Sequence, residues 1–78
     1  MLELFVSDTC PYCQKVVKYF NDNDIEYSKC DVKIPENLER LVDLGGMAQV
    51  PFLYDKDKAL RMYESEDIIS YVRENVAK

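Results

Sequence analysis

A Cys-x-x-Cys motif at a predicted helix start constrains this chain more than any other feature of its sequence. Residues 2–6, which are apolar except for Glu3, predict a short buried strand, and a polar turn leads from it into Cys10-Pro11-Tyr12-Cys13. Because proline is favoured at the first position of a helix, Pro11 predicts that a helix begins there, with Cys10 at its N-cap. The motif therefore lies at the junction of a strand and a helix.

The two cysteines of this motif are expected to differ in their chemistry. Residues three apart share one side of a helical turn, so the two sulfurs can close a disulfide. The positive end of the helix dipole and the free N–H groups stabilise a thiolate at the N-cap, which predicts Cys10 as the nucleophile. Cys13 lies one turn further along and faces the core, which suits it to resolve a mixed disulfide.

The rest of the chain continues the alternation of strands and helices. The sequence predicts a strand at 25–32, a helix from Pro35 to Gly45-Gly46, a hairpin of strands 50–55 and 59–63, and a final helix from Ser65. The order βαβαββα predicts an α/β fold with a four-stranded mixed sheet and three helices, in which the first two strands are parallel. At 78 residues the chain is expected to form one domain over 1–78.

Apolar stripes mark the helix faces that should be buried. They recur at the helical spacing of three and four residues in all three predicted helices. The stripes consist of Cys13, Val16, Val17 and Phe20 in the first helix, Leu38, Leu41 and Val42 in the second, and Ile68, Ile69, Val72 and Val76 in the third.

Charge and composition exclude several classes of function. Ten basic against fifteen acidic residues give a net charge of −5, which opposes binding to nucleic acid or to an anionic membrane surface. The chain has no histidine, which removes Ser-His and Cys-His catalysis. An odd number of cysteines cannot form a fully paired disulfide framework, and the start of the chain lacks the pattern of a signal peptide. These features predict a cytoplasmic protein.

The cysteines also bear on metal binding. A zinc site needs four soft ligands, and only Cys30 is left to join Cys10 and Cys13. The prediction is therefore no metal site within one chain, although a cluster shared between two chains remains open. Cys30 lies within a strand pattern and is interpreted as a small buried apolar residue.

Three segments together resemble the dithiol glutaredoxins. They are Cys10-Pro11-Tyr12-Cys13 after a first strand, Gln49-Val50-Pro51 before a hairpin, and an acidic helix start near the end of the chain. The resemblance implies a thioredoxin fold and a monomer with no permanently bound cofactor. It further implies that glutathione serves as cosubstrate and that the substrates are disulfide-containing or glutathionylated proteins.

The resemblance also implies one part of a glutathione site. In glutaredoxins the peptide bond before the proline corresponding to Pro51 is cis, and the backbone at the position of Val50 pairs with the cysteinyl part of glutathione. A cis bond can turn these backbone groups out of the sheet toward a ligand at Cys10. The position of Tyr12 between the cysteines suggests a contact to substrate or glutathione.

The start of the last helix carries the other part of the implied site. Glu64-Ser65 is similar to the Glu-Ser pair of glutathione transferase N-terminal domains, in which the serine and its N–H hold the γ-glutamyl carboxylate. A helix N-terminus favours an anion, so this role suits Ser65. Glu66 or Asp67 is then expected to meet the ammonium group of the ligand. The alternative is that Ser65 is only a helix cap.

The chain departs from the glutaredoxin pattern at two places. Ser7 stands where these proteins commonly carry a lysine, and Asn37 and Arg40 do not align cleanly with the usual basic or amide side chain before Val-Pro. Two other functions therefore stay open. One is a thioredoxin-like reductase recycled by a flavoprotein. The other is a dimeric iron–sulfur carrier bridged by two Cys10 thiolates and two glutathiones.

Overall fold

A computed structural model of the protein describes residues 2–76. Its elements are β1 (Leu2–Val6), α1 (Pro11–Asp22), β2 (Tyr27–Asp31), α2 (Pro35–Gly45), β3 (Phe52–Asp55), β4 (Leu60–Met62) and α3 (Ser65–Asn75). The predicted order is confirmed, but three strands are shorter than predicted. Ile25, for example, donates its N–H to the carbonyl of Phe20, so it closes the end of α1 instead of pairing in the sheet.

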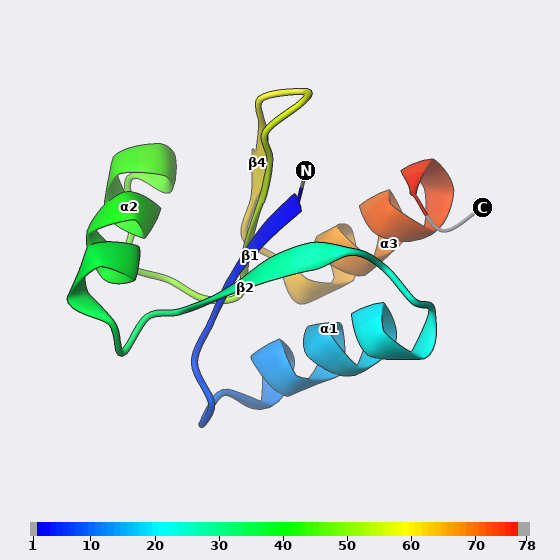
Figure 1. Ribbon diagram of the computed structural model, residues 1–78, viewed down its shortest axis with the longest axis horizontal. Helices are drawn as coiled ribbons and strands as arrows, with labels where there is room; N and C mark the ends of the chain where they lie inside the picture. The colour runs from blue at the N-terminus through cyan, green and yellow to red at the C-terminus, as the bar shows by residue number, and fades with distance from the viewer. Residues whose placement is uncertain (1, 77–78) are drawn as a thin grey trace.

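The four strands form one mixed sheet in the order β2-β1-β3-β4. Strand β1 is parallel to β2 and antiparallel to β3, and β3 and β4 form the predicted hairpin. Figure 1 shows β1 near the middle of this sheet. Its side chains are buried on both faces, as expected for a central strand covered by helices on each side. The α/β architecture expected from the sequence is thus confirmed.

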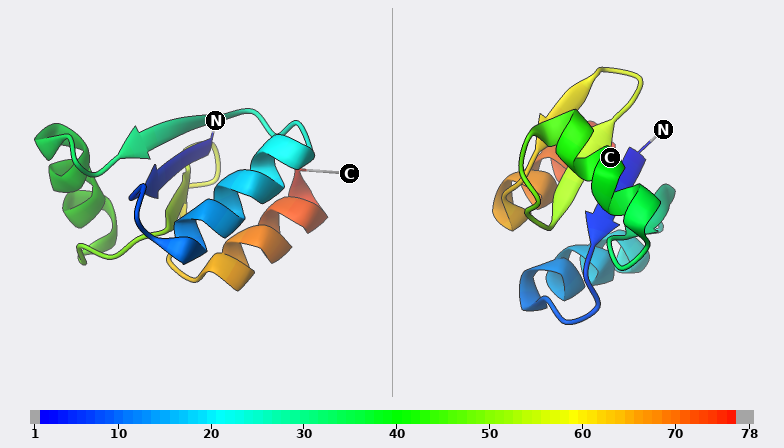
Figure 2. Two further views of the ribbon diagram at one scale, coloured as in Figure 1. Left: turned by 90° about the horizontal axis from the view of Figure 1, so that it is seen from below. Right: turned by 90° about the vertical axis from the view of Figure 1, so that its left-hand side faces the viewer.

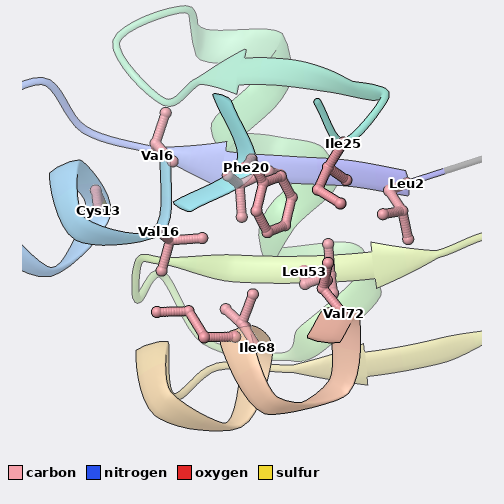
Figure 3. Packing of buried hydrophobic residues seen from close by; sticks show 11 residues of the cluster. Leu2, Val6, Cys13, Val16, Phe20, Ile25, Leu53, Ile68 and Val72 are labelled. Atoms are coloured by element: carbon pink, nitrogen blue, oxygen red, sulfur yellow. The ribbon is translucent and has the colours of Figure 1, made fainter. Parts of the chain in front are cut away.

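Helices α1 and α3 cover one face of the sheet, and α2 covers the other (Figure 2). Helices α1 and α3 lie side by side and run in the same direction, so their N-termini are neighbours. Between them and the sheet lies the larger apolar cluster, which includes Val16, Phe20, Leu53 and Ile68 (Figure 3). Among the described residues, no helix has the length and apolar character needed to cross a membrane.

The apolar stripe of α2 is less buried than predicted. Leu41 is fully buried against Phe5 and Phe52, but the side chains of Leu38 and Val42 are 39% and 41% exposed. The reason is that, among the described elements, α2 lies alone on its face of the sheet, whereas α1 and α3 pack against each other. Only the centre of the α2 stripe meets the sheet.

The prediction for Val76 is wrong. This residue was expected on the inner face of the last helix, but it is 43% exposed. Helix α3 ends at Asn75, and the backbone of Val76 has left the helical conformation at φ −124°. The helical periodicity that would turn Val76 inward therefore stops one residue too early.

Candidate active site

Cys10 lies at the N-terminus of α1, as predicted. It is the N-cap residue, with φ −92° and ψ 117°, and Pro11 follows at the first helical position. The Cys10 carbonyl accepts the N–H of Gln14 at 3.1 Å, and the Cys10 N–H donates to the carbonyl of Ser7 at 3.2 Å. The Cys10 side chain is half-buried. Its sulfur thus lies at the positive end of the helix with a path to solvent.

Cys13 lies beneath Cys10 in the core. Its side chain is 1% exposed and belongs to the cluster between the sheet and α1. Burial is the main cause that raises the pKa of the Cys13 thiol to about 11, and the N–H of Ser7, which donates to its sulfur, opposes that shift. Cys13 therefore holds its proton at neutral pH.

Cys30 lies on the opposite face of the sheet from Cys13. It packs with Phe5, Leu41 and Phe52 and is 8% exposed, which confirms its interpretation as a buried residue. Burial raises the pKa of its thiol as well. All three cysteines are free thiols in the structure.

One cavity brings together most of the side chains predicted to bind glutathione. Its volume is about 370 Å³, and its lining residues come from the start of α1, the start of α3 with the residues just before it, and the segment that precedes β3. The predicted residues in its lining are Tyr12, Val50, Pro51, Ser65 and Glu66; the others are Lys15, Gln49, Tyr63 and Glu64. Asp67 lies in the first turn of α3 but does not line the cavity.

Val50 is one of the residues that line this cavity. The Val50–Pro51 peptide bond is cis, as the glutaredoxin resemblance implied. Within residues 2–76, neither the N–H nor the carbonyl of Val50 has a hydrogen-bond partner. Buried or half-buried backbone groups are nearly always paired, so an unpaired N–H and carbonyl at a cavity wall indicate a place for a polar ligand or water.

Ser65 is not the cap of the last helix. The N-cap of α3 is Glu64, and Ser65 is the first helical residue, with its side chain buried. The hydroxyl of Ser65 makes no hydrogen bond within the described part of the chain. Its hydroxyl and the free N–H groups of the first turn are therefore available together at the cavity wall.

Lys15 is a cavity residue that the sequence analysis missed. Its ammonium pairs with the carboxylate of Glu66, which joins α1 to the first turn of α3. Among the described lining residues it is the one cation. The spacing of three between Tyr12 and Lys15 on one helix could have indicated that they share a face.

Three residues considered in place of the usual cations lie outside this cavity. Ser7 lines a different cavity of about 340 Å³ on another side of α1. Arg40 forms two hydrogen bonds of 2.8 Å with the carboxylate of Glu3. The Asn37 side chain donates to the carbonyl of Asp31 at 3.0 Å. The cation of this cavity therefore comes from α1.

Comparison with known proteins identifies the family. The sequence profile of the glutathione S-transferase N-terminal domain matches residues 4–78. The chain belongs to this family. It is also 35% identical over 71 residues to Glutaredoxin 2 of Escherichia coli, which covers 91% of this chain and 32% of that protein. The expected relationship to glutaredoxins is thus confirmed, and the chain spans about a third of the length of the curated relatives it matches.

Solved structures support the same family and fold. A glutathione S-transferase from the Antarctic clam Laternula elliptica is 25% identical, with a TM-score of 0.80 over 99% of this chain and 36% of that chain. A thioredoxin-like protein is 19% identical, with a TM-score of 0.80 over 95% of this chain and 97% of its own. The second comparison shows the thioredoxin fold on a chain of similar size.

Proposed function

We propose that residues 1–78 form a single glutaredoxin-like domain that acts as a glutathione-dependent thiol-disulfide oxidoreductase. The observation that carries this proposal is the asymmetry of the two motif cysteines. Cys10 is half-buried at the N-terminus of α1, whereas the fully buried Cys13 has a pKa of about 11. One half-buried thiol at a helix start and one protonated thiol behind it suit attack followed by resolution.

In the monothiol reaction, the Cys10 thiolate attacks the glutathione sulfur of a glutathionylated protein. A disulfide forms between Cys10 and glutathione, and the protein leaves as a thiolate that takes a proton from water. The thiolate of a second glutathione then attacks the glutathione sulfur bound to Cys10. Oxidised glutathione leaves and the Cys10 thiolate is restored. In the net reaction the protein sulfur is reduced from a disulfide to a thiol and the second glutathione is oxidised, while the glutathione first bound to the protein remains in a disulfide and leaves as half of oxidised glutathione.

In the dithiol reaction, Cys10 attacks a protein disulfide and forms a mixed disulfide. Cys13 loses its proton and attacks the sulfur of Cys10, which releases the substrate with both its thiols reduced and leaves a Cys10–Cys13 disulfide. Two glutathiones then reduce this disulfide and become oxidised glutathione. The high pKa of Cys13 means that its deprotonation must accompany the attack.

The cavity between the starts of α1 and α3 is the proposed glutathione site; Cys10 is the N-cap of α1 but is not one of the lining residues. Val50 offers unpaired backbone groups for the cysteinyl part of the ligand, next to the cis Val50–Pro51 bond. Ser65 and the first-turn N–H groups of α3 suit the γ-glutamyl carboxylate. The proposal also includes Tyr12, which is 65% exposed and lines the cavity, and either Glu66 or Asp67 for the ligand ammonium.

The remaining parts of the proposal follow from this chemistry. Every proposed site residue comes from one chain, so a monomer suffices. No permanently bound cofactor or metal takes part. Free thiols and a glutathione pool that keeps them reduced belong to the cytoplasm. The partners are glutathione and proteins that carry disulfides or bound glutathione, while nucleic acid and membranes are not expected as partners.

A coupled assay tests the proposal. Turnover of a glutathionylated peptide is measured with glutathione and glutathione reductase, and in parallel with thioredoxin reductase alone. Cys13→Ser should keep most turnover of the glutathionylated peptide but lose the reduction of protein disulfides that need a second thiol. Cys10→Ser should lose both activities.

The same assay separates the alternatives. Turnover with thioredoxin reductase and not with glutathione would favour the thioredoxin-like reductase. A brown protein with visible absorption that lacks both activities would favour the iron–sulfur carrier. Equal loss of both activities in Cys13→Ser would mean that the monothiol route does not operate.

A further inference from the structure

The hydroxyl of Tyr63 holds the backbone of Met47 at two atoms. It accepts a hydrogen bond from the Met47 N–H at 3.1 Å and donates one to the Met47 carbonyl at 3.0 Å. Tyr63 follows β4, while Met47 lies just after α2, sixteen residues earlier in the chain. One side chain thus connects two segments that the sequence keeps apart.

The ring of Tyr63 is held as firmly as its hydroxyl. It packs against Phe52, with ring centroids 4.7 Å apart. The end of the Tyr63 side chain also lies against Gly45, where an added Cβ atom would overlap the Tyr63 hydroxyl. The small residue at the end of α2 therefore lets the hydroxyl reach the Met47 backbone.

This contact anchors the start of residues 47–50. Within the described residues, the two bonds to Tyr63 are the only hydrogen bonds made by this segment. The segment ends at Val50, which lines the cavity, and Tyr63 lines the same cavity. The bonds to Tyr63 thus hold the start of the segment at Met47, and the Val50 side chain at its end packs against both apolar clusters.

We propose that Tyr63 is a positioning residue that sets the affinity of the cavity for glutathione by anchoring the 47–50 segment. The inference rests on the proposed function, because it concerns the ligand that pairs with the Val50 backbone. A backbone pair contributes to binding only if it is already held at hydrogen-bonding distance, since ordering a loose segment costs conformational free energy. The proposed role of Tyr63 involves no contact with the Cys10 sulfur, so the thiol chemistry should be unchanged when the Tyr63 hydroxyl is removed.

Tyr63→Phe tests the proposal because it removes the hydroxyl and keeps the ring. The matched control is Tyr54→Phe, since Tyr54 lies on β3 outside the cavity lining, with its ring beneath Arg61. With the full chain, KM for glutathione should rise about fivefold or more in Tyr63→Phe, while kcat at saturating glutathione stays within about twofold of wild type. Tyr54→Phe should change neither constant.

Two further measurements remove the ambiguity of a purely structural effect. Amide hydrogen exchange at Met47 should become faster in Tyr63→Phe alone, and the rate of Cys10 alkylation should be the same in all three proteins. Faster exchange at Met47 with an unchanged KM would overturn the positioning role. A fall of kcat in Tyr63→Phe as large as the expected rise in KM would also overturn it. Slower alkylation of Cys10 in this variant would do the same.

A failure of the proposed function would be seen in the wild-type protein and not only in the variant. In that case the wild-type protein itself would show no turnover with glutathione. The inference would then fall with the function, and the exchange data would show that Tyr63 only stabilises the fold.

Discussion

The main-chain N–H of Ser7 donates a hydrogen bond to the Sγ of Cys13 across 3.5 Å. The loop that enters the Cys-x-x-Cys motif thereby contacts the thiol that lies behind it. The side-chain hydroxyl of Ser7 interacts instead with that of Thr9, at 3.2 Å. Replacing Ser7 by lysine would change the side chain but keep the main-chain N–H. The hydrogen bond to the Cys13 sulfur therefore does not depend on the Ser7 side chain.

Cys10 should be the only thiol that reacts quickly with iodoacetamide in the folded, reduced protein. With a pKa of about 11 for Cys13, only ~10⁻⁴ of that thiol is ionised at neutral pH, and Cys30 is buried as well. Mass spectrometry of peptides after short labelling times measures the order of modification. In denaturant, all three cysteines should label at similar rates. Early labelling of Cys13 or Cys30 in the folded protein would contradict the proposed roles.

The reduced protein should lose stability as the pH rises from about 9 to 11. The folded-state pKa of Cys13 is raised from 9.0 to about 11, so in this window the folded state holds a proton that the unfolded state has lost. The stabilisation is complete below pH 9 and falls by up to about 2 kcal/mol as the pH approaches 11. Cys30, whose pKa is also raised, acts in the same direction.

Urea unfolding with an excess of reductant measures this loss of stability. Cys13→Ala serves as the control because alanine does not titrate. Its free energy of unfolding should be lower than that of wild type at pH 8 but should fall less steeply at high pH. Parallel curves for the two proteins would show that Cys13 does not titrate as expected.

Gly45→Ala should destabilise the protein more than Gly46→Ala. A Cβ atom at Gly45 would overlap the Tyr63 hydroxyl and lie 2.9 Å from a ring carbon of Phe52, which forces the buried rings to shift. Overpacking of this kind typically costs about 1–3 kcal/mol. At Gly46 the Cβ would enter open space, and the cost is the strain of a φ of +86°, about 1 kcal/mol. Urea unfolding of both variants measures the difference, and equal losses would contradict the close packing of Tyr63 on Gly45.

Lys15→Gln should change the affinity for glutathione more than the free energy of unfolding. The Lys15 and Glu66 side chains are 53% and 71% exposed, so their ion pair is expected to contribute no more than about 1 kcal/mol to folding. Lys15 is nevertheless the cation among the described lining residues, and glutathione is an anion. Lys15→Gln should therefore raise KM for glutathione about two- to fivefold, with a smaller effect at high salt.

The control for this prediction exchanges the two charges. Lys15→Glu combined with Glu66→Lys keeps an ion pair between α1 and α3 but reverses its direction. This double variant should recover the stability of wild type and still bind glutathione weakly, because it moves the cation to position 66 of the lining, where the proposal puts the ligand ammonium. Recovery of both properties would mean that the pair acts only as a link between the helices.

Local sequence determined the elements and the two motif cysteines' positions. Pro11 can begin a helix but cannot continue one, so the N-cap position of Cys10 follows from its neighbour. The helical spacing placed Cys13 on a buried face, and Gly46, with its positive φ, ends α2 as predicted. These properties depend on residues within one or two turns, which a sequence pattern shows directly.

Tertiary structure alone decided which distant residues meet at the cavity. Lys15 pairs with a carboxylate 51 positions away, and Tyr63 reaches back to Met47. Neither contact has a local pattern, because each arises from how the sheet places two separate elements side by side. The exposure of Leu38 depends likewise on α2 having no neighbouring helix on its face. A periodic stripe determines which residues share one side of a helix, but only the packing of the other elements decides how much of that side is covered.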